Sequence, residues 1–186
     1  MDFGSIIGLL NPLKWIEKGL KYSRRPILRI YFDASETFHT RRLADMNNIP
    51  GFFCHLMVSN DGKETAKECS LQLIQVEIRN QAGQFISHQD FLNPVVLKWA
   101  HESDFRPREI DPDIPRRLDL CLAVQSQPSF FSFATHKIPS GNRTDFPPGE
   151  YRVKVRVRSN NTKSTDGTYL VKYAGVWNQF EIAESS

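Results

Sequence analysis

Strict alternation of apolar and charged residues near the C-terminal end of the chain constrains the fold more than any other sequence feature. Between Tyr151 and Arg158 the sequence reads YRVKVRVR, so an apolar residue and a cation alternate without a break. Successive side chains of a β-strand point to opposite faces, whereas an α-helix would distribute the same residues around its whole circumference. This segment is therefore predicted to be a strand that turns Val153, Val155 and Val157 toward a core and its cations toward solvent.

Similar short segments recur from Pro26 onward. They are rich in β-branched and aromatic residues, and clusters of Pro, Gly and Asn separate them, as is typical of strands joined by turns. The predicted strands are residues 27–33, 52–60, 69–78, 118–124, 129–135, 151–157, 168–173 and 176–182. No helical periodicity follows Gly19. About eight short strands predict an all-β domain over residues 26–186, built as a sandwich of two antiparallel sheets.

The third of these strands changes parity half-way along its length. From Cys69 to Leu73 every second residue is apolar, but from Ile74 to Ile78 the apolar residues take the alternate positions. One extra residue in a strand restores both sets to the same face. A β-bulge is therefore predicted near Leu73.

The three cysteines, Cys54, Cys69 and Cys121, form neither a disulfide framework nor a pair with the spacing of zinc ligands. Strand parity predicts that Cys54 and Cys69 face the core and that Cys121 faces outward. An odd number of cysteines suits a reducing compartment. We therefore expect a cytoplasmic chain that binds no metal and no cofactor.

Two stretches resemble the immunoglobulin-like sandwiches of bacterial adhesion and accessory proteins. The run VSNDGKETAKECSLQL, from Val58 to Leu73, looks like a hairpin of that pattern, and FPPGEYRVKVRVRS resembles the proline-glycine turn that starts its penultimate strand. Within the hairpin, Asp61 and Gly62 are typical of a turn that needs a positive φ. The resemblance covers residues 26–182 and implies an immunoglobulin-like fold. It implies no catalytic residues, because these families have no common chemistry.

Residues 1–25 follow a different pattern, with apolar residues first and cations after them. Asn11 and Pro12 are typical of a helix start, and Leu13, Ile16 and Leu20 then share one face, so a short amphipathic helix is predicted. An apolar tip, an interfacial Trp and a trailing basic cluster are typical of a helix on an anionic membrane surface. The residues expected to dock on a membrane or a partner are Ile6, Leu10, Leu13, Trp15, Ile16, Lys18, Lys21, Arg24 and Arg25. The alternative is that this face packs on the domain or pairs two copies as a homodimer.

The position of the charges bears on targeting and on partners. Residues 1–25 contain five Lys and Arg against Asp2 and Glu17, an excess equal to the formal net charge of +3 of the whole chain. Because an acid precedes the apolar run and the cations follow it, a secretory signal is disfavoured, and Pro12 ends the run well short of a membrane span. The expected location is cytoplasmic, peripheral at a membrane. The nearly neutral remainder disfavours a nucleic-acid partner.

A second candidate surface follows from the alternating strand. Its outward residues are Arg152, Lys154, Arg156 and Arg158. Successive side chains on one face of a strand are about 7 Å apart. The neighbouring predicted strands supply few acids, so this row is a candidate site for an acidic partner, a phosphate or an anionic lipid. The alternative is an ordinary solvated sheet face. No aromatic residue is interleaved on that face, which disfavours base stacking with a nucleic acid.

Motifs of known catalytic or phosphate-binding chemistry are lacking in the sequence, with no Gly-rich phosphate loop and no nucleophile elbow. The sharpest cluster of acid-base or metal-binding residue types is His101, Glu102 and Asp104. We therefore expect a non-enzymatic binding or accessory module that docks on a protein partner or an anionic membrane surface. The alternative is a metal-dependent or hydrolytic module that uses the loop containing His101, Glu102 and Asp104.

Overall fold

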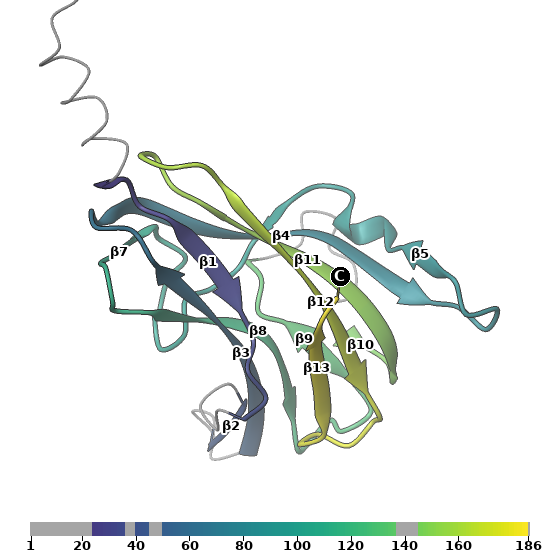
Figure 1. Cartoon of the computed structure of the whole chain (residues 1–186). Coiled ribbons are helices and arrows are strands. Elements are labelled where there is room, and N and C mark those ends of the chain that lie inside the picture. The colour runs from purple at the N-terminus through teal and green to yellow at the C-terminus, as the bar shows by residue number, and fades with distance from the viewer. Residues whose placement is uncertain (1–23, 36–39, 45–49, 137–144, 186) are drawn as a thin grey trace, which may run out of the picture.

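The computed structural model describes residues 24–35, 40–44, 50–136 and 145–185, with the backbone alone for residues 40–44. Within these ranges the chain is all-β, and Figure 1 shows its strands arranged in two layers. The prediction of an all-β domain with two antiparallel sheets is confirmed. The amphipathic helix predicted within residues 1–25 lies outside the described residues, except for Arg24 and Arg25.

The first sheet has six strands. Their order is β1-β3-β8-β9-β10, with β2 paired to β3 beside β1. The strands are β1 (Leu28–Tyr31), β2 (Thr40–Ala44), β3 (Pro50–Asn60), β8 (Arg116–Val124), β9 (Phe131–Phe133) and β10 (Asp145–Phe146).

The second sheet has seven strands. Their order is β13-β12-β11-β4-β5, and the short strands β6 and β7 also pair with β4. The strands are β4 (Ala66–Arg79), β5 (Phe85–Ser87), β6 (Val95–Val96), β7 (Arg108–Ile110), β11 (Gly149–Arg158), β12 (Thr165–Tyr173) and β13 (Phe180–Glu184). A 3-10 turn, η2 (Gln89–Phe91), follows β5.

Both sheets contribute alternate side chains to one core. The three valines of β11 are completely buried, which confirms the inner face predicted from the alternation. At one end of the core, aromatic rings from both sheets pack edge to face; the rings of Phe131 and Tyr151, for example, have centroids 5.1 Å apart. Such pairs contribute about 0.5–1.5 kcal/mol each beyond the burial of their surface.

The β-bulge predicted near Leu73 is confirmed. Opposite β11, Lys154 pairs with Gln75 and Val155 pairs with Leu73, so Ile74 is the extra residue. The bulge returns Val76 to the core, where it is 1% exposed. A strand as long as β4 can therefore keep one apolar face although its sequence changes parity.

The parity predicted for Cys121 is wrong, because a second bulge interrupts the pairing of β3 with β8. Cys54 pairs with Cys121 and His55 pairs with Asp119, so Leu120 is the extra residue. Cys121 is consequently completely buried on the same face as Cys54.

The number of strands is also corrected, from about eight to thirteen among the described residues. The additional strands β2, β5, β6, β7 and β10 contain two to five residues each. Three of them lie in the segment between residues 80 and 117, which showed no strand pattern in the sequence. Segments this short are held in place by pairing with β4 rather than by an apolar pattern of their own.

Candidate functional site

The place where residues 1–23 join the described domain lies between two hairpin tips. Residues 24–27 run beside the tip of the β3–β4 hairpin (residues 61–65) and beside the tip of the β11–β12 hairpin (residues 159–164). Figure 1 shows these three segments together at one end of the molecule. We call them the N-terminal junction.

Hydrogen bonds from both tips hold residues 24–27. The backbone amide of Asp61 donates to the carbonyl of Ile27 (2.8 Å), and the amide of Glu64 donates to the carbonyl of Arg24 (3.0 Å). From the other tip, the hydroxyl of Thr162 donates to the backbone of this segment at 2.7 Å. Because hydrogen bonds reach this segment from both sides, the position of residues 24–27 is set by the fold.

The junction packs so closely that it requires glycine at position 62. A Cβ atom on Gly62 would lie 2.2 Å from the carbonyl oxygen of Arg25 and 2.7 Å from the Cα of Pro26. The buried Asn60 side chain supports the same contact, since its amide oxygen accepts from the backbone N–H groups of Gly62 (3.0 Å) and Ile27 (3.1 Å). Gly62 does not adopt the positive φ predicted for it, so its role is to permit close approach of two backbones.

Exposed cations outnumber acids at the N-terminal junction. The cations are Arg24, Arg25, Lys63 and Lys163, and the acids are Asp61 and Glu64. Between the tips lies a hollow of about 440 Å³ that is lined by Arg25, Glu64, Asn160, Asn161, Thr162 and Lys163. The predicted docking residues Arg24 and Arg25 are thus exposed, whereas Ile6, Leu10, Leu13, Trp15, Ile16, Lys18 and Lys21 lie outside the described residues.

The predicted row of cations on β11 lies on the outer face of the second sheet, as Arg152, Lys154, Arg156 and Arg158. Acids from the adjacent strands pair with three of them, so the row is neutralised more fully than the sequence predicts. Asp166 of β12 accepts hydrogen bonds from Arg156 at 2.6 and 2.8 Å and lies 3.2 Å from the ammonium of Lys154. Glu77 of β4 accepts one from Arg152. The hydrogen bonds from Arg156 hold the pKa of Asp166 below its usual range.

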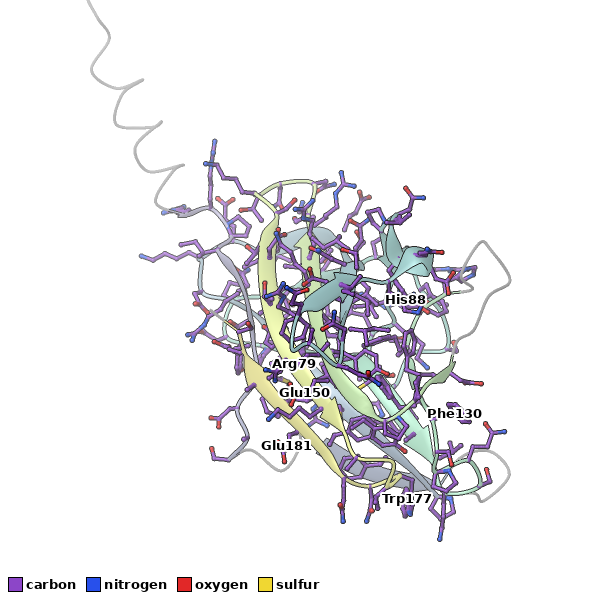
Figure 2. All side chains as sticks on the ribbon, turned by 90° about the vertical axis from the view of Figure 1, so that its right-hand side faces the viewer. Arg79, His88, Phe130, Glu150, Trp177 and Glu181 are labelled. Carbon is purple, nitrogen blue, oxygen red and sulfur yellow. The ribbon has the colours of Figure 1, made fainter. Side chains whose placement is uncertain are left out.

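Alternating charges continue across the same face. Arg79 donates to Glu150 at 2.6 Å, and Lys172 lies 3.8 Å from Glu150 and 3.7 Å from Glu181. Figure 2 shows the labelled side chains Arg79 and Glu150 meeting over the ribbon. The hydrogen bond from Arg79 lowers the pKa of Glu150. This face is therefore a network of ion pairs, and of the four cations on β11 only Arg158 has no ion pair with a described residue.

The loop with His101, Glu102 and Asp104 brings its two acids together around an arginine. The guanidinium of Arg108 lies 2.9 Å from a Glu102 oxygen and 2.8 Å from an Asp104 oxygen. Hydrogen bonding from Arg108 lowers the pKa of Glu102, and that of Asp104 is lowered mainly by a hydrogen bond from a backbone amide. Among the described residues, no group of three or more His, Cys, Asp and Glu side chains could hold a metal ion.

The polar cluster that sequence reasoning missed is buried between β3 and β8. His55 and Asp119 are directly opposite, with Nδ1 of the imidazole 2.9 Å from the carboxylate, although the two groups are not aligned as a hydrogen bond. The ammonium of Lys98 lies 3.9 Å from the other carboxylate oxygen, and the ring of His101 has its centroid 6.4 Å from that of His55. The residue His55 is 1% exposed, so a dissolved substrate cannot reach it. The alternation along β3 places His55 on the outer face of the sheet, where a solvated side chain is expected. The sequence therefore gives no indication that His55 is buried.

Comparison with known proteins finds no family model that matches the chain and no curated protein that matches it. In the part of the chain that the structure describes, no helix has the length and apolar character needed to cross a membrane.

Proposed function

We propose that this chain is a non-enzymatic binding module that docks on an anionic membrane surface through residues 1–25. The proposal combines the apolar-then-basic order of that segment with the place where it joins the domain. The N-terminal junction presents Arg24, Arg25, Lys63 and Lys163 to solvent around the point of attachment. Cations near a membrane that contains anionic lipids each contribute about 1 kcal/mol of attraction.

In this proposal the apolar residues of the segment and the cations of the junction have different tasks. The apolar side chains Leu13, Trp15 and Ile16 enter the boundary between headgroups and acyl chains, and the cations of the junction contact the phosphates. An apolar segment alone binds weakly, and a few cations alone bind weakly, so we expect that both are needed together for stable docking. The β-sandwich, which we propose to be of the immunoglobulin-like type, is then held at a peripheral cytoplasmic site with its other surfaces available to a protein partner.

The observation that carries the proposal is the contrast between the junction and the basic row on β11. Three cations of that row pair with Glu77 and Asp166, whereas no ion pair with Lys63 or Lys163 occurs within the described part of the chain. The junction is therefore the more favourable surface for lipid phosphates. The alternative enzymatic use of the loop with His101 is disfavoured, because Arg108, together with Arg106 and Arg116, pairs with both of its acids.

Flotation of the full chain with lipid vesicles tests the proposal. We expect co-flotation with vesicles that contain phosphatidylglycerol, less with pure phosphatidylcholine, and a decrease with both as salt is raised, because exposed charges are screened. Replacing Leu13 and Ile16 by Glu is expected to abolish flotation. The matched control is Ile86→Glu, which changes an isoleucine that is 55% exposed on β5, away from the junction.

The proposal is refuted if the full chain stays in the soluble fraction with anionic vesicles at low salt. Equal loss of flotation in the Ile86→Glu control would also refute it, since the segment would then have no special role. Light scattering on the same samples tests the homodimer alternative. A dimer that the Leu13 and Ile16 substitutions dissociate would show that this face pairs two copies instead.

A further inference from the structure

Two cysteines lie face to face in the first sheet. Cys54 of β3 and Cys121 of β8 are directly opposite in the antiparallel ladder, beside the bulge at Leu120. Both residues are completely buried, and their side chains lie next to each other on the inner face of the sheet. Neither strand lies at an edge at this point, since Cys54 also pairs with β2 and Cys121 with β9.

Directly opposite residues in an antiparallel ladder satisfy the geometric needs of a disulfide. Their side chains point to the same face, and their Cα atoms are about 4.5 or 5.5 Å apart, depending on the hydrogen-bond pattern. A disulfide requires a Cα separation of about 4.4–6.8 Å. Bond formation between Cys54 and Cys121 therefore requires rotation of side chains and no rearrangement of strands.

We propose that Cys54 and Cys121 form a dithiol–disulfide couple, which a small-molecule disulfide such as oxidised glutathione converts to a cross-strand bond that locks β3 to β8. The thiolate of one cysteine attacks the sulfur–sulfur bond of oxidised glutathione, which gives a mixed disulfide and releases one glutathione thiolate. The second cysteine then attacks the protein sulfur of the mixed disulfide and releases the other glutathione. Two protons pass from the cysteines to the two glutathiones, and two electrons pass from the protein to the oxidant.

Cys69 is not a competing partner. It belongs to β4 in the other sheet, where its thiol is near Ser159 and Arg116. Arg116 and Cys121 are five residues apart in β8, which is roughly 16 Å along a strand. Cys69 is therefore at the far end of the core from the pair and provides an internal control.

Burial determines when the bond can form. It raises the pKa of the Cys54 thiol, so the reactive thiolate is scarce in the folded chain, and an oxidant cannot reach either sulfur while the core is closed. Oxidation is consequently expected during folding or during opening of the first sheet. In a reducing compartment both thiols stay reduced, whereas exposure of a folding chain to a glutathione-type oxidant gives the locked form.

The test is refolding of the full chain from denaturant in a mixture of reduced and oxidised glutathione, followed by alkylation of free thiols and peptide mass mapping. We expect one alkylated cysteine, Cys69, and a peptide containing Cys54 linked to a peptide containing Cys121. The variant Cys69→Ser should form the same link, and Cys121→Ala should not. Because the wild-type map is decisive alone, the proposal stays testable if a variant fails to fold.

A second readout is thermal stability of the wild-type chain. The bond closes a loop of roughly 70 residues, so the oxidised form should melt on the order of 10 °C above the reduced form and should return to the lower Tm after reduction. Three alkylated cysteines after refolding, a link that involves Cys69, or glutathione adducts in place of a link would overturn the proposal. An oxidised form with the same Tm as the reduced form would contradict the claim that the disulfide stabilises the pairing of β3 with β8.

Discussion

Replacing Gly62 by Ala should loosen the N-terminal junction without disturbing the core. The new Cβ atom would lie 2.2 Å from the carbonyl oxygen of Arg25 and 2.8 Å from the amide nitrogen of Ile27. These are backbone atoms, so residues 24–27 must move away as a unit. The movement breaks the hydrogen bonds from the amides of Asp61 and Glu64 to this segment and the contacts of Asn60 with it.

The magnitude follows from the bonds that are lost. The bonds donated by Asp61, Glu64 and Ile27, at about 1 kcal/mol each net of solvation, give about 3 kcal/mol; the longer bond from Lys63 shares the Arg24 carbonyl with Glu64 and is not added separately. Restricting the unfolded chain by Gly→Ala returns about 0.4–1 kcal/mol, so the free energy of unfolding should fall by about 2 kcal/mol. Urea unfolding measures this change, with an unchanged slope because the core remains intact.

Gly149→Ala is the matched control. A Cβ atom there would meet only the ring of Tyr151, at 3.4–3.6 Å, so the change in the free energy of unfolding should stay within about 1 kcal/mol. Hydrogen exchange should also be faster at the amides of Asp61 and Glu64 in Gly62→Ala than in the control. If Gly62→Ala unfolds at the same urea concentration as the wild type, the close approach at the junction is not as described.

Three other substitutions test the charges and the buried polar groups. Asp166→Asn removes the partner of Arg156 and should lower the free energy of unfolding at neutral pH by about 0.5–1 kcal/mol. Because the pKa of Asp166 is lowered in the folded state, the wild type should lose this advantage as the pH falls through that pKa. The urea unfolding curves of the two proteins should therefore converge at low pH. Burial raises the pKa of Tyr151 to about 12. The contribution of its neutral phenol to the free energy of unfolding is therefore complete below the pKa of the unfolded chain, near 10, and is lost as the pH rises through the folded pKa. Tyr151→Phe should remove one phenolate from the ultraviolet titration near pH 12. Asp119→Ala leaves the buried His55 without its carboxylate and should cost about 2–4 kcal/mol in urea unfolding; a loss below 1 kcal/mol would mean that the pair contributes little.

The sheets and one face of each long strand could be predicted from the sequence, because apolar alternation acts locally. The buried face of β11 follows from valines that alternate without a break, and the bulge at Ile74 follows from an alternation that shifts by one residue within β4. The strands β5, β6 and β7, of two or three residues each, carry no such pattern. They exist because β4 offers a free backbone edge at that point, and that edge is a property of the fold.

The candidate sites were less predictable, because their chemistry depends on which strands are neighbours. Glu77 lies 75 residues from Arg152 in sequence, yet it pairs with that arginine across the β4–β11 ladder. Asp166, ten residues after Arg156, pairs with it across the β11–β12 hairpin. The bulge in β8 likewise has no counterpart in its own sequence, so Cys121 was predicted to face outward when it faces Cys54. In both cases register between distant strands, rather than local pattern, decides what a side chain contacts.

The central claim, that residues 1–25 enter an anionic membrane surface, is tested most directly by tryptophan quenching. Vesicles whose acyl chains carry bromine quench the fluorescence of tryptophans that enter the acyl region, and Trp99, which is 2% exposed in the core, serves as an internal reference. We expect quenching of the full chain with anionic brominated vesicles, its disappearance in Trp15→Phe, and its persistence in Trp177→Phe. Absence of quenching in the wild type, or quenching that survives in Trp15→Phe, would contradict the claim.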